Sequence, residues 1–585
     1  MRRRAPAQPP TRADRIRGAI ILAVLLLAVA VAVLLAWAVP ALAAWVHSGR
    51  LAPLGLVDAL AAPLDGRLRG SDPAAAYPRP VARLLPGAWG FWGTGALLAT
   101  ALAAGTFGVA RAAEVRMSRP TADRRWWQLR GLRPREFGRY RHVSELIVDG
   151  PSPERVIVGH LGRPHARLAI SDSVQMAVIA APRTGKSSGL VIPALLEHEG
   201  PVVTTSVRTD IAEHTLARRE RLGRVWVWDP FGQRSDAWDL LQGCEDWEHA
   251  LLVARWLGHA RKIGEGINQD YFDQEAEGLV APYLHAAALT PDVTAAGVYR
   301  WILDRDVDTA AGILEDAGAV DARDRLMSVY AYTERQRDGI IGTAGVQLKA
   351  YGHPAAARTA RRAEGVTPDA LFGGSNTLYV VAGREHQQLL APLVVTMISS
   401  MLFALSEREN RTGKGLRPPA LFALDETASI APIEALPAIL ATSLGSGVRF
   451  LTVWHSVAQI RRHFGPDAAA EILALSQAKV LMGSITDQHT REEVVELLGR
   501  RQLGAGRQSD GADVMTAQAL QRMTAGDGLL VHSDLPPVLF RQRRHYLDRG
   551  LRKLKGTSAG GEGGFRLPGR AAVDPQDDPW LDSSG

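Results

Sequence analysis

The chain has 585 residues, a formal net charge of +7, 46% hydrophobic residues and 22% charged residues. This balance excludes an intrinsically disordered chain and is typical of a globular protein with three or four structural units. Cys244 is the only cysteine, which excludes an intrachain disulfide and favours a buried thiol in a reducing compartment.

Two long uncharged runs come first along the chain. Residues 18–46 and 84–110 carry no charged side chain, and each run exceeds the roughly 20 residues that a helix needs to cross a bilayer. A cleaved signal peptide is the alternative for the first run, because Ala41–Ala44 resembles a cleavage site. Apolar regions of signal peptides are shorter, roughly 7–15 residues. We therefore expect two transmembrane helices, with an extracytoplasmic segment at 47–83.

Arginines flank both runs. Residues 1–17 form a basic N-terminus, and residues 111–173, which we interpret as a linker and the start of a cytoplasmic domain, begin with several arginines. The positive-inside rule places both flanks in the cytoplasm. The connecting segment also contains arginines, so charge alone does not decide the orientation. A nucleotide site farther along the chain decides it, because such a site must face the cytosol.

Short apolar runs alternate with helical stretches from about residue 174 onward, which predicts a mostly parallel α/β sheet. We expect a nucleotide-binding domain formed by residues 174–239 and 363–552, with a terminal hairpin around Leu535–Pro537. Residues 240–362 have helical periodicity and predict an inserted all-α domain. Residues 553–585 predict a disordered tail with an acidic tip. The expected strands lie in VQMAVIA, PVVTTS, RVWVWDP, NTLYVVAG, PALFALDE, VRFLTVWHS, AKVLMGS, DGLLVHSD and VLFRQRRHY.

The stretch AVIAAPRTGKSSGLVIPALL, which begins at Ala177, has the order strand, loop, helix. A phosphate-binding loop needs backbone N–H groups aimed at phosphate oxygens, a lysine for the β/γ-phosphates and a hydroxyl for magnesium. Ala180 stands where glycine is usual, and alanine is excluded there only if its φ is positive. Pro193 should kink or restart the helix. The expected ATP-binding residues are Pro182, Arg183, Thr184, Gly185, Lys186, Ser187 and Ser188.

The stretch PALFALDE ends an apolar strand with Asp425 and Glu426. Adjacent carboxylates at the end of a buried strand are costly unless they bind a metal or accept hydrogen bonds. In sites of this class an aspartate helps to hold Mg²⁺ and a neighbouring residue activates the attacking water. We therefore expect ATP and Mg²⁺ as cofactors, Ser187 and Asp425 at the metal, and Glu426 as the general base. The alternative, an ordinary acidic pair, is disfavoured by the loop upstream.

These motifs resemble those of type IV secretion coupling proteins of the TraG/TraD kind, within the FtsK/HerA branch of RecA-like motors. The matching blocks cover nearly the whole soluble part, in order: IAAPRTGKSSGLVIPALL, VVTTSVRTDIAEHTLARRERLGRVWVWDP, NTLYVVAGREHQQLLAPLV, LFALDETASIAPIEALPAILATSLGSGVRFLTVWHSVAQIRRHFG, GSITDQHTREEVVELLG and HSDLPPVLF. The resemblance implies a RecA-like P-loop nucleotide-binding domain with an inserted all-α domain and two N-terminal transmembrane helices.

The resemblance also implies a function. Coupling proteins of this kind are membrane-anchored, homo-hexameric ATPases that bring DNA–relaxase complexes, single-stranded DNA or secreted proteins to the channel components of a type IV secretion or conjugation system. The implied location is the bacterial inner membrane, with several passes and the bulk of the chain in the cytoplasm. The helical insert is implied to contact the cargo, and whether that cargo is DNA or protein stays open.

One position departs from the family pattern. The family usually has glutamine after the strand that follows the DE pair, whereas TVWHSVAQ places His455 there and Gln459 four residues later. A neutral imidazole can donate one hydrogen bond, as a glutamine amide can. We therefore expect His455 as a second catalytic residue, and a strand-end histidine bonded to backbone is the alternative. The resemblance also implies an arginine finger, for which Arg449 is a candidate, although a surface salt bridge explains it equally well.

Two other functions compete with a coupling ATPase. An FtsK-like double-stranded DNA translocase shares the motor motifs, but a DNA pump does not need the long insert. A non-hydrolysing membrane receptor with a degenerate loop is the other alternative, and intact Lys186, Ser187, Asp425 and Glu426 argue against it.

Overall fold

The computed structural model describes residues 33–64, 71–117, 142–161, 166–171, 173–233, 235–259, 267–362, 365–498, 515–532 and 535–555. The chain forms two compact units, Met1–Trp126 and Trp127–Gly585.

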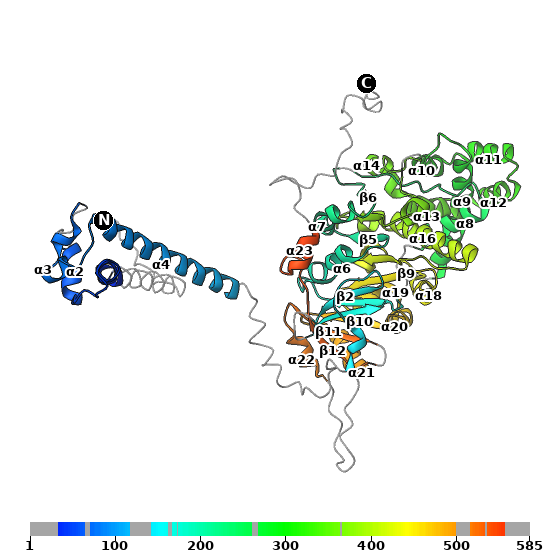
Figure 1. The fold of residues 1–585 in the computed structure, drawn as a ribbon. Coiled ribbons are helices and arrows are strands. Elements are labelled where there is room, and N and C mark those ends of the chain that lie inside the picture. Colours follow the sequence, from blue (N-terminus) through cyan, green and yellow to red (C-terminus); the bar gives the residue numbers. More distant parts are fainter. Residues whose placement is uncertain are drawn as a thin grey trace, which may run out of the picture. The chain divides into compact units, whose positions relative to one another are not determined.

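In the first unit, two apolar helices flank a short helical segment (Figure 1). The flanking helices are Val33–Ser48 and α4 (Ala88–Met117). The segment between them contains α2 (Leu56–Leu64), the 3-10 turn η1 (Pro73–Ala76) and α3 (Arg79–Ala82). A small core that includes Ala44, Ala59, Tyr77 and Phe91 holds these pieces together.

The two predicted membrane helices are only partly visible in this unit. Much of the predicted span 18–46 lies outside the described residues, and the predicted span 84–110 coincides with most of α4. Among the described residues, one helix is long and apolar enough to cross a bilayer, α16 (Gln387–Thr412) of the second unit, and 61% of its apolar stretch is buried. Helix α16 is therefore a core helix, and the N-terminal spans stay predictions.

The second unit is built on a twelve-stranded mixed sheet with the order β1-β3-β2-β12-β11-β10-β4-β9-β8-β5-β7-β6. Neighbouring strands from β10 to β6 are parallel, and those from β1 to β10 are antiparallel. Most parallel strands are buried along their whole length, which explains their continuous apolar runs. The strands are β1 (Ile147–Val148), β2 (Arg155–His160), β3 (Arg167–Ser171), β4 (Met176–Ala180), β5 (Val202–Ser206), β6 (Val225–Trp228), β7 (Thr377–Val381), β8 (Ala420–Leu424), β9 (Val448–Trp454), β10 (Ala478–Met482), β11 (Asp527–His532) and β12 (Val538–Arg541).

Helices cover both faces of this sheet, and each face has its own hydrophobic core. One core contains α6, α7 and α23, and the other contains α16 and the helices that follow β8 and β9. The described helices of the second unit outside the insert are η4 (Ser144–Leu146), η5 (Ser187–Val191), α6 (Ile192–Glu197), α7 (Asp210–Arg219), α15 (Pro368–Phe372), α16, α17 (Thr427–Ile430), α18 (Leu436–Thr442), α19 (Val457–Phe464), α20 (Pro466–Leu475), α21 (Gln488–Leu498), α22 (Ala517–Gln521) and α23 (Arg549–Lys555).

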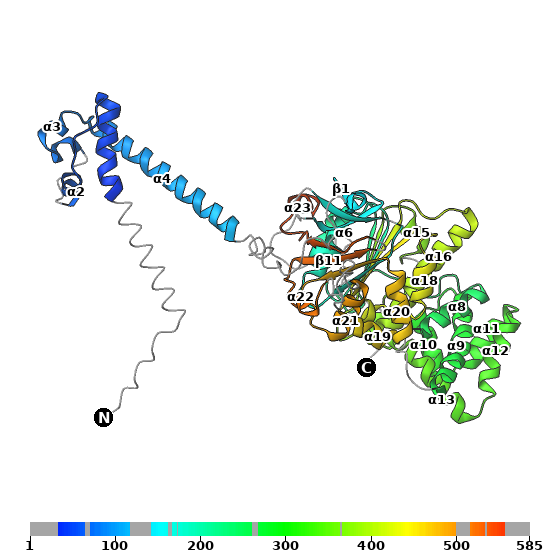
Figure 2. The same ribbon diagram turned by 90° about the horizontal axis from the view of Figure 1, so that it is seen from below.

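The insert between β6 and β7 contains only helices among its described residues. They are α8 (Trp247–Gly258), α9 (Ile267–Ala288), α10 (Ala295–Asp304), α11 (Val307–Asp316), α12 (Val320–Tyr330), α13 (Glu334–Gln347), η6 (Lys349–Gly352) and α14 (Pro354–Ala357). Figures 1 and 2 show α8–α13 together at one end of the unit, away from α22. The insert shares one continuous core with α16, so it is not structurally independent of the sheet.

The nine strands expected from sequence are all present, and the terminal hairpin β11–β12 is antiparallel. Strands β1, β2 and β3 lie in residues 111–173, for which a linker and a domain start were expected, and they extend the sheet with an antiparallel edge. The tail expected from residue 553 needs a correction, because α23 extends to Lys555. The rest of that tail lies outside the described residues. Cys244 is buried.

Candidate nucleotide-binding site

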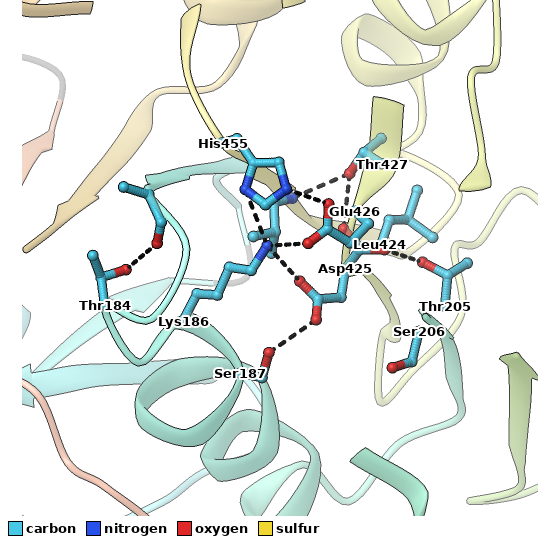
Figure 3. Close-up of polar contacts among 12 residues, drawn as sticks. Thr184, Lys186, Ser187, Thr205, Ser206, Leu424, Asp425, Glu426, Thr427 and His455 are labelled. Carbon is cyan, nitrogen blue, oxygen red and sulfur yellow. Dashed lines mark hydrogen bonds and ion pairs between the residues drawn. The ribbon is translucent and has the colours of Figure 1, made fainter. Parts of the chain in front are cut away.

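Three adjacent parallel strands bring the expected site residues together. β4 pairs with β9, and β9 pairs with β8, so their carboxyl ends lie at one edge of the sheet. The phosphate loop follows β4, Asp425 and Glu426 follow β8, and His455 follows β9. Figure 3 shows the Lys186, Asp425, Glu426 and His455 side chains converging at this edge. Ligands of open α/β sheets bind at such a carboxyl edge.

The loop after β4 has the backbone that a phosphate-binding loop requires. Arg183 and Gly185 have positive φ angles of 64° and 94°. The hydroxyl of Thr184 donates a hydrogen bond to the Ala181 carbonyl at 2.7 Å and closes the turn. The first turn after Lys186 is a π-helix, and α6 begins with Pro193 in its first turn, so the expected irregularity at this proline is present.

Lys186 lies at the centre of the cluster. Its ammonium donates a short hydrogen bond to Glu426 Oε1 and lies 3.7 Å from Asp425 Oδ1. His455 Nδ1 is 3.5 Å from the same Lys186 nitrogen. The ammonium is thus surrounded by acceptor groups at the position where the β- and γ-phosphates of a nucleotide would lie.

Ser187 and Asp425 fit the requirements of a magnesium site. Ser187 Oγ donates to Asp425 Oδ2 at 2.9 Å, so the hydroxyl and the carboxylate lie side by side. Asp425 Oδ1 is buried and accepts no hydrogen bond from any described residue. Burial raises the pKa of Asp425 above its ordinary value, whereas the charge of Lys186 lowers it. A hard cation such as Mg²⁺ prefers oxygen ligands of this kind and would satisfy the buried oxygen.

Glu426 is held in a strained backbone and a strong electrostatic field. Its φ is 59°, in the left-handed region that favours glycine. Burial would raise the pKa of Glu426, but the hydrogen bond from His455 and the charge of Lys186 outweigh it and lower the pKa to about 2. The Glu426 carboxylate is therefore fully ionised at neutral pH.

His455 contacts Glu426 directly. His455 Nε2 lies 2.7 Å from Glu426 Oε2, and the His455 backbone N–H donates to Gln459 Oε1 at 2.8 Å. The neutral tautomer with its proton on Nε2 can donate to Glu426 and leave Nδ1 to face Lys186. The imidazole is thus bonded to the expected general base, and Gln459 holds the backbone behind it.

Three of the expected loop residues lie farther from the acidic cluster. Pro182 and Arg183 are exposed, and Thr184 is buried under the loop. Arg449, considered as an arginine finger or a surface salt bridge, is 1% exposed near the amino end of β9 and donates to the Glu154 carbonyl at 2.9 Å. The burial of Arg449 contradicts a surface salt bridge, and its place at the end of β9 opposite the site argues against an arginine finger.

Several residues that support the site were not expected from sequence. The Thr205 hydroxyl donates to the Asp425 carbonyl at 2.8 Å, and the Thr427 hydroxyl donates to the Leu424 carbonyl at 2.8 Å. Gln542 Nε2 donates to the Thr184 carbonyl at 3.2 Å from 358 residues away in the chain. The sequence near Thr205 and Thr427 could have indicated a role at the site, since both residues adjoin the ends of strands. Nothing in the sequence near Gln542 indicates its contact with the loop.

The family model described as "Type IV secretory system Conjugative DNA transfer" matches residues 153–517. The chain belongs to this family. The match contains the first half of the nucleotide-binding domain, the whole helical insert and the second half as far as residue 517, so it agrees with the resemblance seen in the motifs.

Curated relatives and solved structures agree with this membership. The chain is 20% identical to Protein VirD4 of Agrobacterium fabrum over 72% of this chain and 66% of that protein. It is 24% identical to the conjugal transfer protein TraG of Escherichia coli over 58% of this chain and 57% of that protein. The chain thus spans somewhat less than two thirds of these relatives.

Two structures of a coupling protein have the same fold. The unbound bacterial conjugative coupling protein TrwBdeltaN70 aligns with a TM-score of 0.55 and 14% identity, over 70% of this chain and 93% of that chain. TrwB in complex with ADP and Mg²⁺ aligns with a TM-score of 0.54 and 14% identity, over 70% and 94%. The RecA-like α/β fold with a mixed sheet is therefore established for this family member.

Proposed function

We propose that this chain is a membrane-anchored ATPase that acts as the coupling protein of a type IV secretion or conjugation system. The observation that carries the proposal is the cluster of Lys186, Asp425, Glu426 and His455 at the carboxyl edge of β4, β8 and β9. A lysine for the phosphates, a serine and a buried aspartate for Mg²⁺, and an ionised glutamate that can activate water are groups that ATP hydrolysis uses.

Each residue has a defined role in this proposal. Lys186 binds the β- and γ-phosphates, and the loop backbone around Gly185 and Ser188 surrounds the phosphate chain. Ser187 and Asp425 would hold Mg²⁺, which supplies charge neutralisation to the phosphate oxygens. Glu426 accepts the proton of the attacking water, and His455 Nε2 keeps its carboxylate in place.

ATP binding also changes Glu426. Phosphate oxygens compete with Glu426 for the Lys186 ammonium, so nucleotide binding weakens the Lys186–Glu426 ion pair. The pKa of Glu426, which Lys186 and His455 lower to about 2, then rises toward values at which the carboxylate accepts a proton more readily. Binding of the substrate therefore converts an ion-pair partner into a general base.

Exposed tryptophans support the membrane anchor. Trp45 lies near the end of the helix Val33–Ser48 and is 54% exposed, and Trp89 lies at the start of α4 and is 94% exposed. Both helix ends adjoin the connecting segment at 47–83. Tryptophan is enriched where helices leave the bilayer. We infer that these helices span the bacterial inner membrane and that the second unit faces the cytoplasm.

A cavity supports a cargo role for the insert. It has a volume of about 800 Å³ and lies between insert helices α8, α9 and α13 on one side and α16, α17 and α19 on the other. Ser429 of α17 lines it, and α17 begins directly after Glu426. Cargo bound here, whether DNA held by a relaxase or a secreted protein, would touch the helix that adjoins the general base. The assembly we propose is a homo-hexamer at the channel.

ATPase assays of the full chain in detergent, with single-stranded DNA, duplex DNA or no DNA, test the proposal. A coupling ATPase hydrolyses ATP and responds to single-stranded DNA or to its protein cargo. Strong stimulation by duplex DNA alone would favour the translocase, and ATP binding without turnover under every condition would favour the receptor.

A further inference from the structure

The segment that follows β12 lies directly against the phosphate loop. Gln542 Nε2 donates to the Thr184 carbonyl and to the Asp527 carbonyl, both at 3.2 Å. The His545 backbone N–H donates to the Ser188 carbonyl at 3.0 Å. The segment Gln542–Leu547, which we call the C-terminal strap, is therefore bonded to both ends of the loop.

A buried ion pair fixes the strap. Arg543 donates two hydrogen bonds to Glu197 of α6, at 2.9 and 2.7 Å, and a third to Asp548 at 3.1 Å. The Arg543 and Glu197 side chains are 2% and 8% exposed. A bidentate guanidinium–carboxylate pair has a fixed geometry, so the strap has a defined position relative to the helix that follows the loop.

Burial alternates along the first part of the strap, and the rings of His545 and Tyr546 meet edge to face, with centroids 5.3 Å apart. Arg543 and His545 are buried, whereas Arg544 is half-buried and Tyr546 is 47% exposed. Arg544 Nε lies 3.7 Å from the position that a Cβ atom would occupy on Gly185, and Arg544 Nη1 donates to the Tyr546 hydroxyl at 3.0 Å. Arg544 thus adjoins the phosphate loop and holds the phenol of Tyr546 close to it.

The sheet order places the strap at one particular end of the nucleotide. β4 lies between β9 and β10. Glu426 and His455 follow β8 and β9, so the γ-phosphate end of a nucleotide lies on that side of the loop. The α-phosphate and the nucleoside then extend toward β10, β11 and β12. The strap leaves β12 on that side and passes the loop to reach α7, where the ring centroid of His214 lies 4.5 Å from that of His545.

The exposure of Tyr546 is unusual for this part of the molecule. Among the described residues of the second unit outside the insert, the exposed large apolar side chains are Leu497, Tyr546 and Leu547. Two of these three are adjacent, and they lie in the strap. An aromatic ring exposed beside a nucleotide site can stack on a base, because every nucleobase has a π-face.

We propose that the C-terminal strap forms the nucleoside end of the site, with Tyr546 as the surface on which the nucleobase stacks and Arg544 as the residue that positions it. This inference rests on the proposed nucleotide-binding function and extends it to residues far along the chain. Stacking tolerates different bases, so the strap should accept ATP and GTP alike.

Calorimetric titration of the full chain in detergent tests this, with ATP and inorganic triphosphate as separate ligands. Triphosphate carries the phosphate chain without a nucleoside. Tyr546→Ala should raise the Kd for ATP at least about tenfold and leave the Kd for triphosphate unchanged. Tyr546→Phe keeps the ring but loses the hydrogen bond from Arg544, so its Kd for ATP should lie between those of wild type and Tyr546→Ala. Tyr271→Ala, which removes a tyrosine of the insert that is 40% exposed, is the matched control.

The outcomes separate this inference from the proposed function. Unchanged ATP affinity in Tyr546→Ala overturns the proposal that the strap is a nucleoside subsite. A change of assembly state in the same variant would then mark Tyr546 as an interface residue instead. Equal loss of ATP and triphosphate binding in Tyr546→Ala also overturns it, because the residue would then act on the phosphate loop. Failure of wild type to bind either ligand would instead contradict the nucleotide site itself.

Discussion

His455 Nε2 lies 2.7 Å from Glu426 Oε2, and Lys186 pairs with the other oxygen of the same carboxylate, Oε1. The histidine that stands at the position of the family's glutamine therefore points into the site and bonds a side chain there, rather than only the backbone. It positions the carboxylate that we propose as the general base, and its effect on catalysis should pass through Glu426.

This contact predicts a separation of binding from turnover. His455→Ala should bind ATP like wild type and hydrolyse it about tenfold or more slowly, because Glu426 loses its hydrogen-bond donor. His455→Gln retains a donor and should keep most of the activity. Steady-state phosphate release gives kcat for both variants. A kcat for His455→Ala within a factor of two of wild type would show that the contact is not used in catalysis.

Lys186→Ala should remove most of the ATP affinity. A hydrogen bond to a charged group contributes about 1.5–3 kcal/mol, so the Kd should rise roughly tenfold or more. The variant also leaves Glu426 without its ion-pair partner, which raises the pKa of Glu426. Equilibrium binding of ATP to the full chain measures the loss. Wild-type affinity would show that the loop does not bind phosphate.

The cavity between the insert and α17 can be tested with two glycines of the insert. A Cβ atom added at Gly342 or at Gly312 would meet no atom within 4 Å, so a larger side chain should fit at either position. Gly342 lines the cavity, and Gly312 of α11 does not. Gly342→Leu should abolish cargo transfer at normal basal ATPase activity, and Gly312→Leu should leave both unchanged. Normal transfer by Gly342→Leu would remove the cavity from cargo handling.

Acid should destabilise the second unit through His198. Burial, together with the charges of Arg219 and Arg449, lowers the pKa of His198 from 6.5 to about 3. The unfolded chain therefore binds a proton below about pH 6.5 that the folded chain does not, and the free energy of unfolding falls as the pH falls from 6.5 toward 3.

The loss attributable to His198 is about 2 kcal/mol between pH 6.5 and pH 5. His198→Gln retains an amide near the Pro419 carbonyl but does not titrate, so it should flatten that part of the pH dependence. Thermal midpoints of the full chain at the two pH values measure this. Equal midpoint shifts in wild type and His198→Gln would show that another group dominates.

The parallel part of the fold was predictable because fully buried strands have continuous apolar sequences. The residues around Lys186, Asp425, Glu426 and His455 were predictable because each follows such a strand. Strands β2 and β3 were missed because each begins and ends with a half-buried polar residue, which interrupts the apolar run. Arg449 was misjudged because a charged residue at a strand start gives no sign that it is buried against a carbonyl. The strap was missed because its contacts join residues more than 350 positions apart, as in the bond from Gln542 to Thr184.

The central claim is that Glu426 is the general base of an ATPase site, and phosphate release by Glu426→Gln tests it most directly. The substitution keeps the size of the side chain and removes the proton acceptor. We predict ATP binding at least as tight as in wild type, because Lys186 no longer pairs with a carboxylate at that position, together with turnover reduced by about 10²–10⁴-fold. Turnover reduced by less than about tenfold, at normal ATP binding, would contradict the account.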